Sequence, residues 1–252
     1  MIELNHIQAQ QKFRILLIGD NGIDIYQYGT VDRISPEAPV PIFQLVKEEQ
    51  RPGMAGNVAK NLESMNCCVD FLHTETSVKT RLIDMRSKQQ IVRIDNDADS
   101  TPVTLPTTNL NTYDAVVVSD YNKGTVTYDL IKEIRKQYKG PIFVDTKKID
   151  LAQLQGCIVK INNKEFQAIK TVCDELIVTC GNQGAVYRDR TYLAVKIAVV
   201  DVCGAGDTFL AALCYEYLKS KDMDLAIEFA IRASAVTVQH IGVYAPTLEE
   251  IK

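Results

Sequence analysis

The residues best suited to chemistry lie near the C-terminus, in the run Asp-Val-Cys-Gly-Ala-Gly-Asp-Thr-Phe at positions 201–209. Gly204, Ala205 and Gly206 are small enough to let the backbone approach a ligand, and their N–H groups would be free donors at a helix start. Asp207 would repel an anion there, unless it takes a proton from a hydroxyl while the amides hold the developing charge. The run therefore predicts phosphoryl transfer, with Asp207 as general base.

The same run has a plainer interpretation as a tight turn in which Asp207 only caps a helix. The hydrophobic residues 192–200 predict a strand before it, and the apolar residues 207–218 predict a helix after it. For a Gly-x-Gly-Asp run alone, this structural interpretation is favoured. The choice depends on whether other polar residues gather at the same place.

Length and composition exclude several classes of protein. The chain has 252 residues, 46% of them hydrophobic, and a net charge of −4 without any basic block. It is long enough for one large α/β domain, and it lacks the charge pattern of a nucleic-acid-binding protein. No apolar run is long enough to span a membrane, and residues 1–14 lack the apolar core of an export signal. We therefore predict a cytoplasmic protein that binds neither nucleic acid nor membrane.

The cysteines and histidines point to no metal site. There are seven cysteines, two of them adjacent, and most lie in apolar runs. This odd number suits reduced, buried thiols in the cytoplasm. The three histidines are widely spaced and there is no Cys-x-x-Cys, so a structural zinc site is not expected.

Two N-terminal segments carry polar residues where a ligand could reach them. The apolar residues 14–18 predict a buried strand that ends at Asp20, with Asp24 shortly after it. These aspartates could bind a polyhydroxyl substrate, or residues 20–22 could be a simple turn. Residues 51–57 form a second glycine turn, in which Gly53 and Asn57 open a helix to about residue 65. This segment too could be a plain loop.

Residues 25–46 differ from the rest of the chain. Two alternating segments flank a proline-rich run at 33–41, which cannot be part of a central strand. Together with part of residues 81–97, this segment predicts a small β lid outside the main sheet. Arg93, in the second of these ranges, would point either at the site or at solvent. The apolar face of the lid needs cover, which favours a homodimer through the lid.

From residue 113 onward the pattern is that of an α/β protein. The strands expected at 115–118, 141–144, 157–161 and 176–179 are short, apolar and followed by polar residues. Helices are expected between strands, clearly at 127–138, and a last helix at 222–240. Such a chain predicts a mainly parallel sheet covered on both faces, with the polar strand ends along one rim.

These motifs together resemble the ribokinase-like (PfkB) carbohydrate kinases, whose C-terminal signature Asp-x-x-Gly-Ala-Gly-Asp is matched by residues 201–207. The resemblance implies a three-layer sandwich over residues 1–252, with Asp207 as catalytic base and the amides of 204–207 as anion hole. It implies that ATP and Mg²⁺ are the cofactors, and a monovalent cation is a further candidate. The residues it assigns to ATP are Asn162, Glu165, Thr179, Gly181, Gly184, Gly204 and Gly206, with Glu165 holding Mg²⁺ mainly through water.

A narrower resemblance is to the kinases of ADP-heptose synthesis, which phosphorylate O1 of D-glycero-D-manno-heptose 7-phosphate. It is carried by Gly19-Asp20 with Asp24, by the run Arg-Ile-Ser-Pro-Glu-Ala-Pro-Val-Pro at 33–41, by Arg51-Pro52-Gly53, by Gln89-Gln90 with Arg93 and Asp95, and by the run at 119–124. The substrate residues it implies are Asp20, Asp24, Arg33, Gly53, Asn57, Arg93, Asp120 and Lys123, with Lys123 or another basic residue meeting the 7-phosphate.

Two departures bear on the substrate rather than on the chemistry. The chain is shorter than that family, chiefly between Leu72 and Arg81, and Met54 stands where the family has a glycine or small residue. From its length we expect no nucleotidyltransferase domain like that of some relatives, and expect a separate chain to supply any such step. A kinase for another sugar or nucleoside, of the fructose or ribose type, and a non-catalytic nucleotide- or sugar-binding relative therefore remain alternatives.

Overall fold

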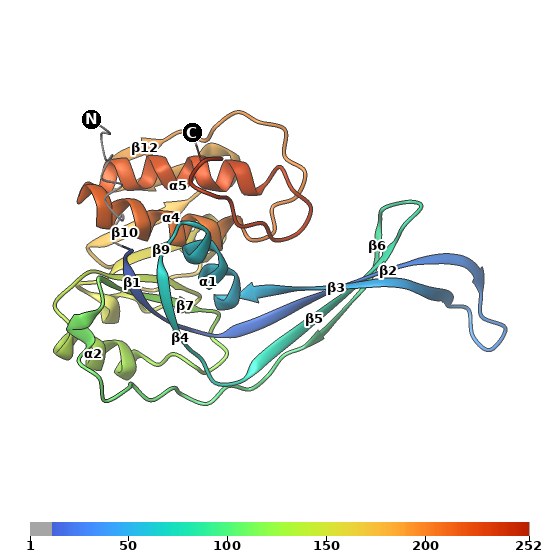
Figure 1. The fold of residues 1–252 in the computed structure, drawn as a ribbon, viewed down its shortest axis with the longest axis horizontal. Coiled ribbons are helices and arrows are strands. Elements are labelled where there is room, and N and C mark those ends of the chain that lie inside the picture. The colour runs from blue at the N-terminus through green and yellow to red at the C-terminus, as the bar shows by residue number, and fades with distance from the viewer. Residues whose placement is uncertain (1–11, 252) are drawn as a thin grey trace, which may run out of the picture.

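The computed structural model describes residues 12–251, so the segment behind the export-signal prediction lies largely outside the described residues. Its centre is an eight-stranded sheet in the order β12-β11-β10-β9-β8-β7-β1-β4 (Figure 1). The strands are β1 (Arg14–Gly19), β4 (Cys68–Leu72), β7 (Ala115–Asp120), β8 (Ile142–Thr146), β9 (Ile158–Asn162), β10 (Glu175–Thr179), β11 (Ala185–Tyr187) and β12 (Arg190–Tyr192). All are parallel from β4 to β10, and β11 and β12 are antiparallel.

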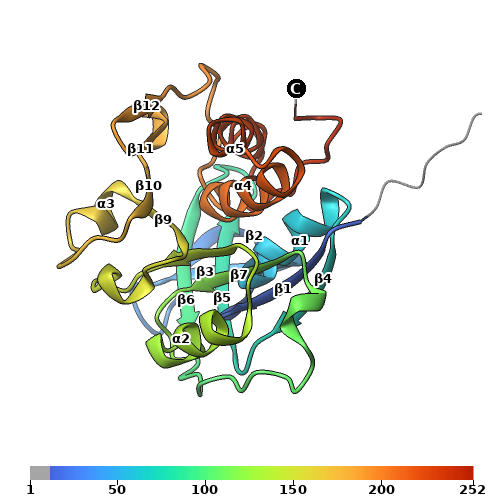
Figure 2. The same cartoon turned by 90° about the vertical axis from the view of Figure 1, so that its left-hand side faces the viewer.

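Helices cover both faces of this sheet, which confirms the predicted α/β sandwich (Figure 2). One face packs against α1 (Ala55–Ser64), α4 (Ala205–Ser220) and α5 (Met223–Thr237), and the other against α2 (Tyr128–Gln137). Side chains of a strand alternate between faces, so Ile15 and Leu17 join one core while Leu16 and Ile18 join the other. All four are fully buried or nearly so, as a doubly covered parallel strand requires.

A second sheet of four strands projects from this body (Figure 1). Its order is β3 (Pro41–Met54), β2 (Asn21–Ile34), β5 (Thr76–Asp84) and β6 (Gln90–Asn96). This sheet, the lid, extends beyond the predicted ranges because β2 and β3 are long strands paired from Asn21 with Met54 to Ile34 with Pro41. No turn forms at residues 20–22, since Asn21 and Gly22 already belong to β2. Only residues 73–75 connect β4 with β5.

Two expectations about local structure are wrong. Residues 193–200 form no strand, because the backbone there leaves the sheet and the N–H groups of Val200 and Asp201 bond to the carbonyl of Val238 after α5. Leu193 is 80% exposed, so this apolar run is not buried in the sheet. The connections around β9 also hold less helix than expected, with only a 3₁₀ turn at Leu151–Leu154 and the four-residue α3 (Asn163–Phe166). No helix among residues 12–251 is both long and apolar enough to span a membrane.

Candidate active site

Asp207 lies in the first turn of α4, between helix α1 and the loop that follows β7. Its side chain is buried and accepts two hydrogen bonds of 2.8 Å, from Asn57 Nδ2 and from the Tyr121 hydroxyl. Burial raises the pKa of Asp207 to about 6, although both hydrogen bonds favour the charged form. A carboxyl group with this pKa changes its protonation near neutral pH, as a general base must.

A chain of buried hydrogen bonds holds Asn57 against Asp207. Asn61 Nδ2 donates to the Asn57 carbonyl at 2.8 Å, and the Asn61 side-chain oxygen accepts from the Thr208 hydroxyl at 2.9 Å. Thr237 in α5 in turn donates to the Thr208 hydroxyl at 2.9 Å. Helices α1, α4 and α5 thus share one polar network, which fixes the donor that faces the carboxylate.

The glycine turn before α4 presents free backbone donors. Among the amides of residues 204–207, only that of Ala205 donates within the described part of the chain, to the Val202 carbonyl at 3.3 Å. Gly204 has a φ of +77°, and a Cβ there would lie 2.7 Å from Asn57 Nδ2, so only glycine fits. Free amides at a helix start are donors that an anion could accept, and the anion hole at 204–207 stays a prediction.

Asp201 closes the turn from its N-terminal side. Its carboxylate accepts from the Cys203 amide at 3.0 Å and from the Gly242 amide at 2.8 Å. This contact ties the glycine turn to the segment that follows α5. Asp201 therefore has a structural role at the start of the motif.

The polar ends of β7 to β10 do lie along one rim, because the strands are parallel neighbours. At the end of β9, Asn162 and Glu165 form a capping box, in which each side chain bonds the backbone of the other. Burial raises the pKa of Glu165, and nearby Asp145 raises it further, while Lys160 and Lys147 lower it. Asn162 is thus occupied in capping α3, and Glu165 faces the charged groups of β8 and β9.

Lys160 is a site residue that the sequence reasoning missed. Its side chain is 4% exposed and its Nζ lies 2.7 Å from Asp145 Oδ2 and 3.3 Å from the Gly206 carbonyl. It therefore places a buried cation beside the glycine turn. The only sequence signal was a lysine within the otherwise apolar strand at 157–161, which a buried strand rarely holds without a partner.

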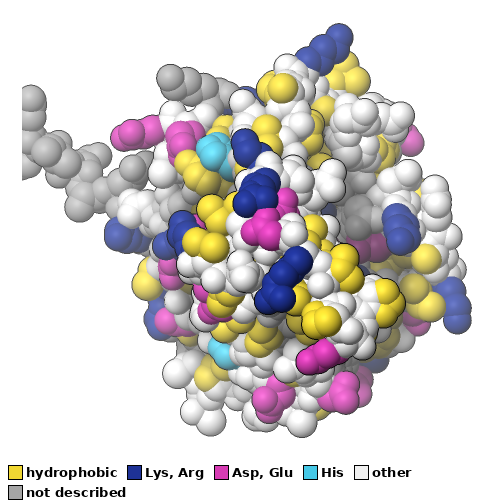
Figure 3. Space-filling model, turned by 90° about the vertical axis from the view of Figure 1, so that its right-hand side faces the viewer, with side chains coloured by type: hydrophobic (Ala, Val, Ile, Leu, Met, Phe, Trp, Pro, Cys, Tyr) yellow, Lys and Arg dark blue, Asp and Glu magenta, His cyan; other side chains and the backbone are white. Residues whose placement is uncertain are grey.

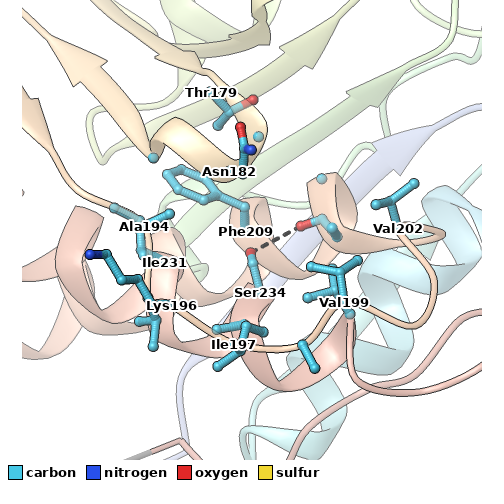
Figure 4. Close-up of a pocket in the computed structure, with 18 residues that line it drawn as sticks. Thr179, Asn182, Ala194, Lys196, Ile197, Val199, Val202, Phe209, Ile231 and Ser234 are labelled. Atoms are coloured by element: carbon cyan, nitrogen blue, oxygen red, sulfur yellow. Dashed lines mark hydrogen bonds between the residues drawn. The ribbon is translucent and has the colours of Figure 1, made fainter.

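A cavity of about 950 Å³ opens beside the glycine turn (Figure 4). Its walls come from the β10–β11 connection, residues 194–199 and 202, and the facing sides of α4 and α5, and are mostly apolar. Thr179, Gly181 and Gly184 line one end, and Ala205 and Gly206 line the side toward Asp207. Residues 194–199 of the apolar run form a wall of this cavity instead of the predicted strand. The volume and lining suit a ligand with a flat apolar base and a charged end.

On the other side of Asn57, the root of the lid forms a polar wall. Asp24 on β2 is buried and pairs with Arg81 on β5 at 2.6 Å. Gly53 packs against it, since a Cβ there would lie 2.7 Å from Asp24 Oδ2. Arg51 and Arg81 lie 5.1 and 5.2 Å from the centre of the Tyr26 ring. The structure thus brings Asp24, Gly53 and Asn57 to one side of the site.

Five other predicted substrate residues have different surroundings. The Asp20 carboxylate accepts from the amides of residues 121, 123 and 125, and so shapes the loop after β7. Asp120 is buried and accepts from Thr146 and from the amide of residue 122. Lys123 Nζ pairs with Asp97. Arg93 pairs with Asp95 on the same exposed edge strand, β6. Arg33 is exposed near the far end of β2.

The described residues hold no group of three or more His, Cys, Asp or Glu side chains that could bind a metal. A Mg²⁺ ion could still be held by one carboxylate together with water and ligand phosphates, which is its usual mode in kinases. Glu165 is the predicted carboxylate, and its capping bond uses only Oε2. The cysteines among residues 12–251 are free, and Cys67, Cys157, Cys173 and Cys214 are buried, whereas Cys68 is exposed.

Comparison with known proteins gives the family. A model described as pfkB family carbohydrate kinase matches residues 58–251, well over half of the chain. The chain is 33% identical to the Bifunctional protein HldE of a Nitratiruptor species and 31% identical to that of Helicobacter pylori, over 96% and 94% of its length. It spans only 64% and 65% of those proteins.

Solved structures of the same fold are more distant in sequence. Ribokinase from Thermotoga maritima superposes with a TM-score of 0.67 at 18% identity, covering 96% of this chain and 98% of that one. Phosphofructokinase-2 from Escherichia coli, solved in complex with potassium, gives 0.72 at 15% identity, covering 96% and 97%. Family model, curated relatives and fold agree, and the chain belongs to the pfkB family of carbohydrate kinases.

Proposed function

We propose that this chain is one ATP-dependent kinase domain that transfers a phosphoryl group to a sugar or sugar-phosphate hydroxyl. The observation that carries the proposal is the buried Asp207, held by Asn57 and Tyr121 next to free amides of a helix start. A carboxylate beside an anion site suits a base that deprotonates a hydroxyl while the amides stabilise charge on the transferred group.

The cavity beside α4 is the proposed ATP site. Its apolar walls would take the base, Thr179, Gly181 and Gly184 would lie along the nucleotide, and the amides at 204–207 would meet the phosphates. Mg²⁺ would supply charge neutralisation at the phosphates, and Glu165 would hold it, chiefly through water. Lys160 would add a fixed positive charge beneath the turn.

The acceptor would lie between Asn57 and the root of the lid. Asp24 and Asn57 would hold its hydroxyls, and Gly53 leaves room beside the Asp24 carboxylate. Asp207 would take the proton of the attacking hydroxyl, and positioning would supply most of the remaining rate. Similarity to the HldE proteins favours D-glycero-D-manno-heptose 7-phosphate, phosphorylated at O1, with Lys123, Arg93 or another lid cation at the 7-phosphate.

The remaining features of the proposal concern partners and place. The lid exposes Leu45, Val46 and Ile94, each more than half accessible, which favours a homodimer through the lid. Figure 3 views the molecule from the lid end, where hydrophobic and charged side chains lie side by side. Phosphofructokinase-2, which has the same fold, was solved with potassium, and a monovalent cation is therefore a further candidate cofactor. We also propose that the protein acts in the cytoplasm.

The test is ADP release with ATP, Mg²⁺ and a panel of acceptors, namely heptose 7-phosphate, fructose 6-phosphate, fructose and ribose. We expect turnover with heptose 7-phosphate and a loss of about 10²–10⁴-fold in kcat for Asp207→Asn, with ATP binding retained. The exposed substitution Asp129→Asn on α2 is the matched control and should keep full activity. If only a different acceptor is turned over, that acceptor is the substrate instead of heptose 7-phosphate. ATP binding without turnover of any acceptor would favour the non-catalytic alternative.

A further inference from the structure

Tyr121 joins the proposed base to a lysine on the rim of the sheet. Its hydroxyl donates to Asp207 Oδ1 at 2.8 Å, and Lys147 Nζ lies 4.4 Å from the centre of its ring. The sheet fixes this arrangement, because Asp120 and Thr146 are paired residues of β7 and β8, and Tyr121 and Lys147 directly follow them. The Lys147 amide also donates to the Asp120 carbonyl at 3.1 Å.

The backbone of Tyr121 is held as firmly as its hydroxyl. Its amide donates to the buried Asp20 carboxylate at 2.8 Å, which also accepts from the amides of residues 123 and 125. Asp20 therefore fixes the loop from which the phenol reaches Asp207. Asp20 is thus buried next to the site with its carboxylate bonded to three backbone amides.

Other groups face Asp207 from each element packed around it. Asn57 on α1 donates the second hydrogen bond, Asp145 on β8 raises the pKa of Asp207, and Lys160 on β9 lowers it. Lys160 is already paired with Asp145 at 2.7 Å, so these two charges largely offset each other. The neutral donors Asn57 and Tyr121 are then the groups that favour the ionised carboxylate.

The two donors differ in what sets their strength. Asn57 is an amide within a closed network of buried side chains. Tyr121 is a phenol with a cation over its ring face, and a cation there is attracted to the ring electrons. Because the cation draws electron density from the ring, it makes the O–H group a stronger donor.

We propose that Tyr121 is a positioning residue that keeps Asp207 ionised and aimed at the acceptor hydroxyl, and that Lys147 strengthens this effect through the aromatic ring. The role in catalysis rests on the proposed kinase function. The effect on Asp207 itself does not, since it belongs to the ligand-free protein.

The first experiment measures the protonation of Asp207 without any substrate. Protein labelled with ¹³C at aspartate carboxyl groups is titrated by NMR, and the Asp207 signal is identified by its absence in Asp207→Asn. In Tyr121→Phe we expect the pKa of Asp207 to rise by about one unit, the usual scale for one hydrogen bond to a buried carboxylate. An unchanged pKa would overturn the proposal.

A second lysine–tyrosine pair, Lys148 with Tyr128, serves as a matched control. Lys148 Nζ lies 5.4 Å from the centre of the Tyr128 ring, and the Tyr128 hydroxyl accepts from the Asp150 amide, with no hydrogen bond to Asp207 or Tyr121 among the described residues. Lys148 also pairs with Asp120 and Asn122, and Tyr128→Phe leaves both contacts in place. Tyr128→Phe removes the same oxygen from a lysine-covered ring. It should leave the Asp207 titration unchanged, and an equal shift there would show a general effect of lost phenols and overturn the specific role.

A double-mutant comparison isolates Lys147. Lys147→Gln should raise the pKa of Asp207 by less than Tyr121→Phe does, and should add nothing in the Tyr121→Phe background. An equal shift in both backgrounds would mean that the lysine acts by direct charge, and would overturn its action through the ring.

Kinetics then separate this inference from the proposed function. If the protein is an active kinase, the acidic limb of its kcat–pH profile should move to higher pH in Tyr121→Phe, by the same number of pH units as the NMR titration. The KM for the acceptor should change little. If the wild type shows no turnover but the titration shifts, the proposed function fails and the positioning contact stands. If the wild type is active and neither the acidic limb nor the titration moves in Tyr121→Phe, the positioning role is refuted and the proposed kinase function stands.

Discussion

Asp207→Asn should make the protein more stable at alkaline pH while it removes the proposed base. The folded pKa of about 6 lies above the ordinary value of 3.8, so the folded protein keeps a proton that the unfolded chain has lost. The associated stability is complete below about pH 4 and is lost as pH rises through 6. A shift of about two units corresponds to about 3 kcal/mol, and the carboxylate is fully buried, so solvent screening is small.

The gain from the substitution is smaller than this cost. Asn57 and Tyr121 donate to different oxygens of Asp207, and an amide places an NH₂ group at one of those positions. One donor must then turn or lose its partner, which costs about 1 kcal/mol. We therefore expect a net gain of about 2 kcal/mol at pH 8.

The pH dependence is the sharper measurement, because the hydrogen-bond cost is the same at every pH. Of this net gain, the linkage relation places an increase of about 1.4 kcal/mol between pH 5 and pH 8. For a chain of this size, the melting temperature of Asp207→Asn relative to wild type should rise by about 3–6 °C over that interval.

Thermal unfolding of both proteins at several pH values between 5 and 8 tests this reasoning. Asp129→Asn, at an exposed position of α2, should change the melting temperature little at either end of the range. A difference between wild type and Asp207→Asn that is constant with pH would refute the raised pKa. A difference that falls with pH would refute its sign.

Three further predictions follow from the same geometry. Lys160→Met should lower the melting temperature by several degrees because it leaves Asp145 with no partner amine, and the added change Asp145→Asn should restore much of the loss, as thermal unfolding would show. Ala194→Trp should fill the cavity beside α4 and weaken ATP binding at least about tenfold in calorimetry, with the fold unchanged by circular dichroism. Ile94→Glu on the exposed lid strand should shift a lid-mediated dimer to monomer in sedimentation, whereas Lys60→Glu on α1 should not.

The main sheet and its rim were predictable because their signals are local. A buried parallel strand is a short apolar run, and the polar residues after it fall at one edge once the strands are parallel. Asp207, Gly204 and Asn57 could therefore be placed together from motif order alone. The hydrogen bond between Asn57 and Asp207 joins residues 150 positions apart, and no local pattern in the sequence reports it.

The misses share a physical cause, which is that they depend on partners distant in the chain. The apolar run 193–200 has strand composition, but its neighbours are α4, α5 and the cavity rather than a sheet edge. Tyr121 and Lys160 carry ordinary side chains whose importance comes only from what they touch. The carboxylates of Asp20 and Asp120 both bond backbone amides of the loop after β7, a contact that the sequence pattern does not report, and their role toward an acceptor stays a prediction.

The predicted shortening between Leu72 and Arg81 would affect the proposed acceptor site more than phosphoryl transfer. The alignment with an HldE protein runs over 299 positions, more than the 252 residues here, so that relative holds additional segments. In this chain β4 passes to β5 through residues 73–75 alone, and the groups around Asp207 come from α1, α4 and the ends of β7 to β9. None of them lies on that connection. Arg81, by contrast, lies on β5, the strand that follows this connection, and it pairs with Asp24 at the root of the lid. A change in this connection would therefore move Arg81, and with it the contacts that select the acceptor, while Asp207 and the glycine turn keep their geometry.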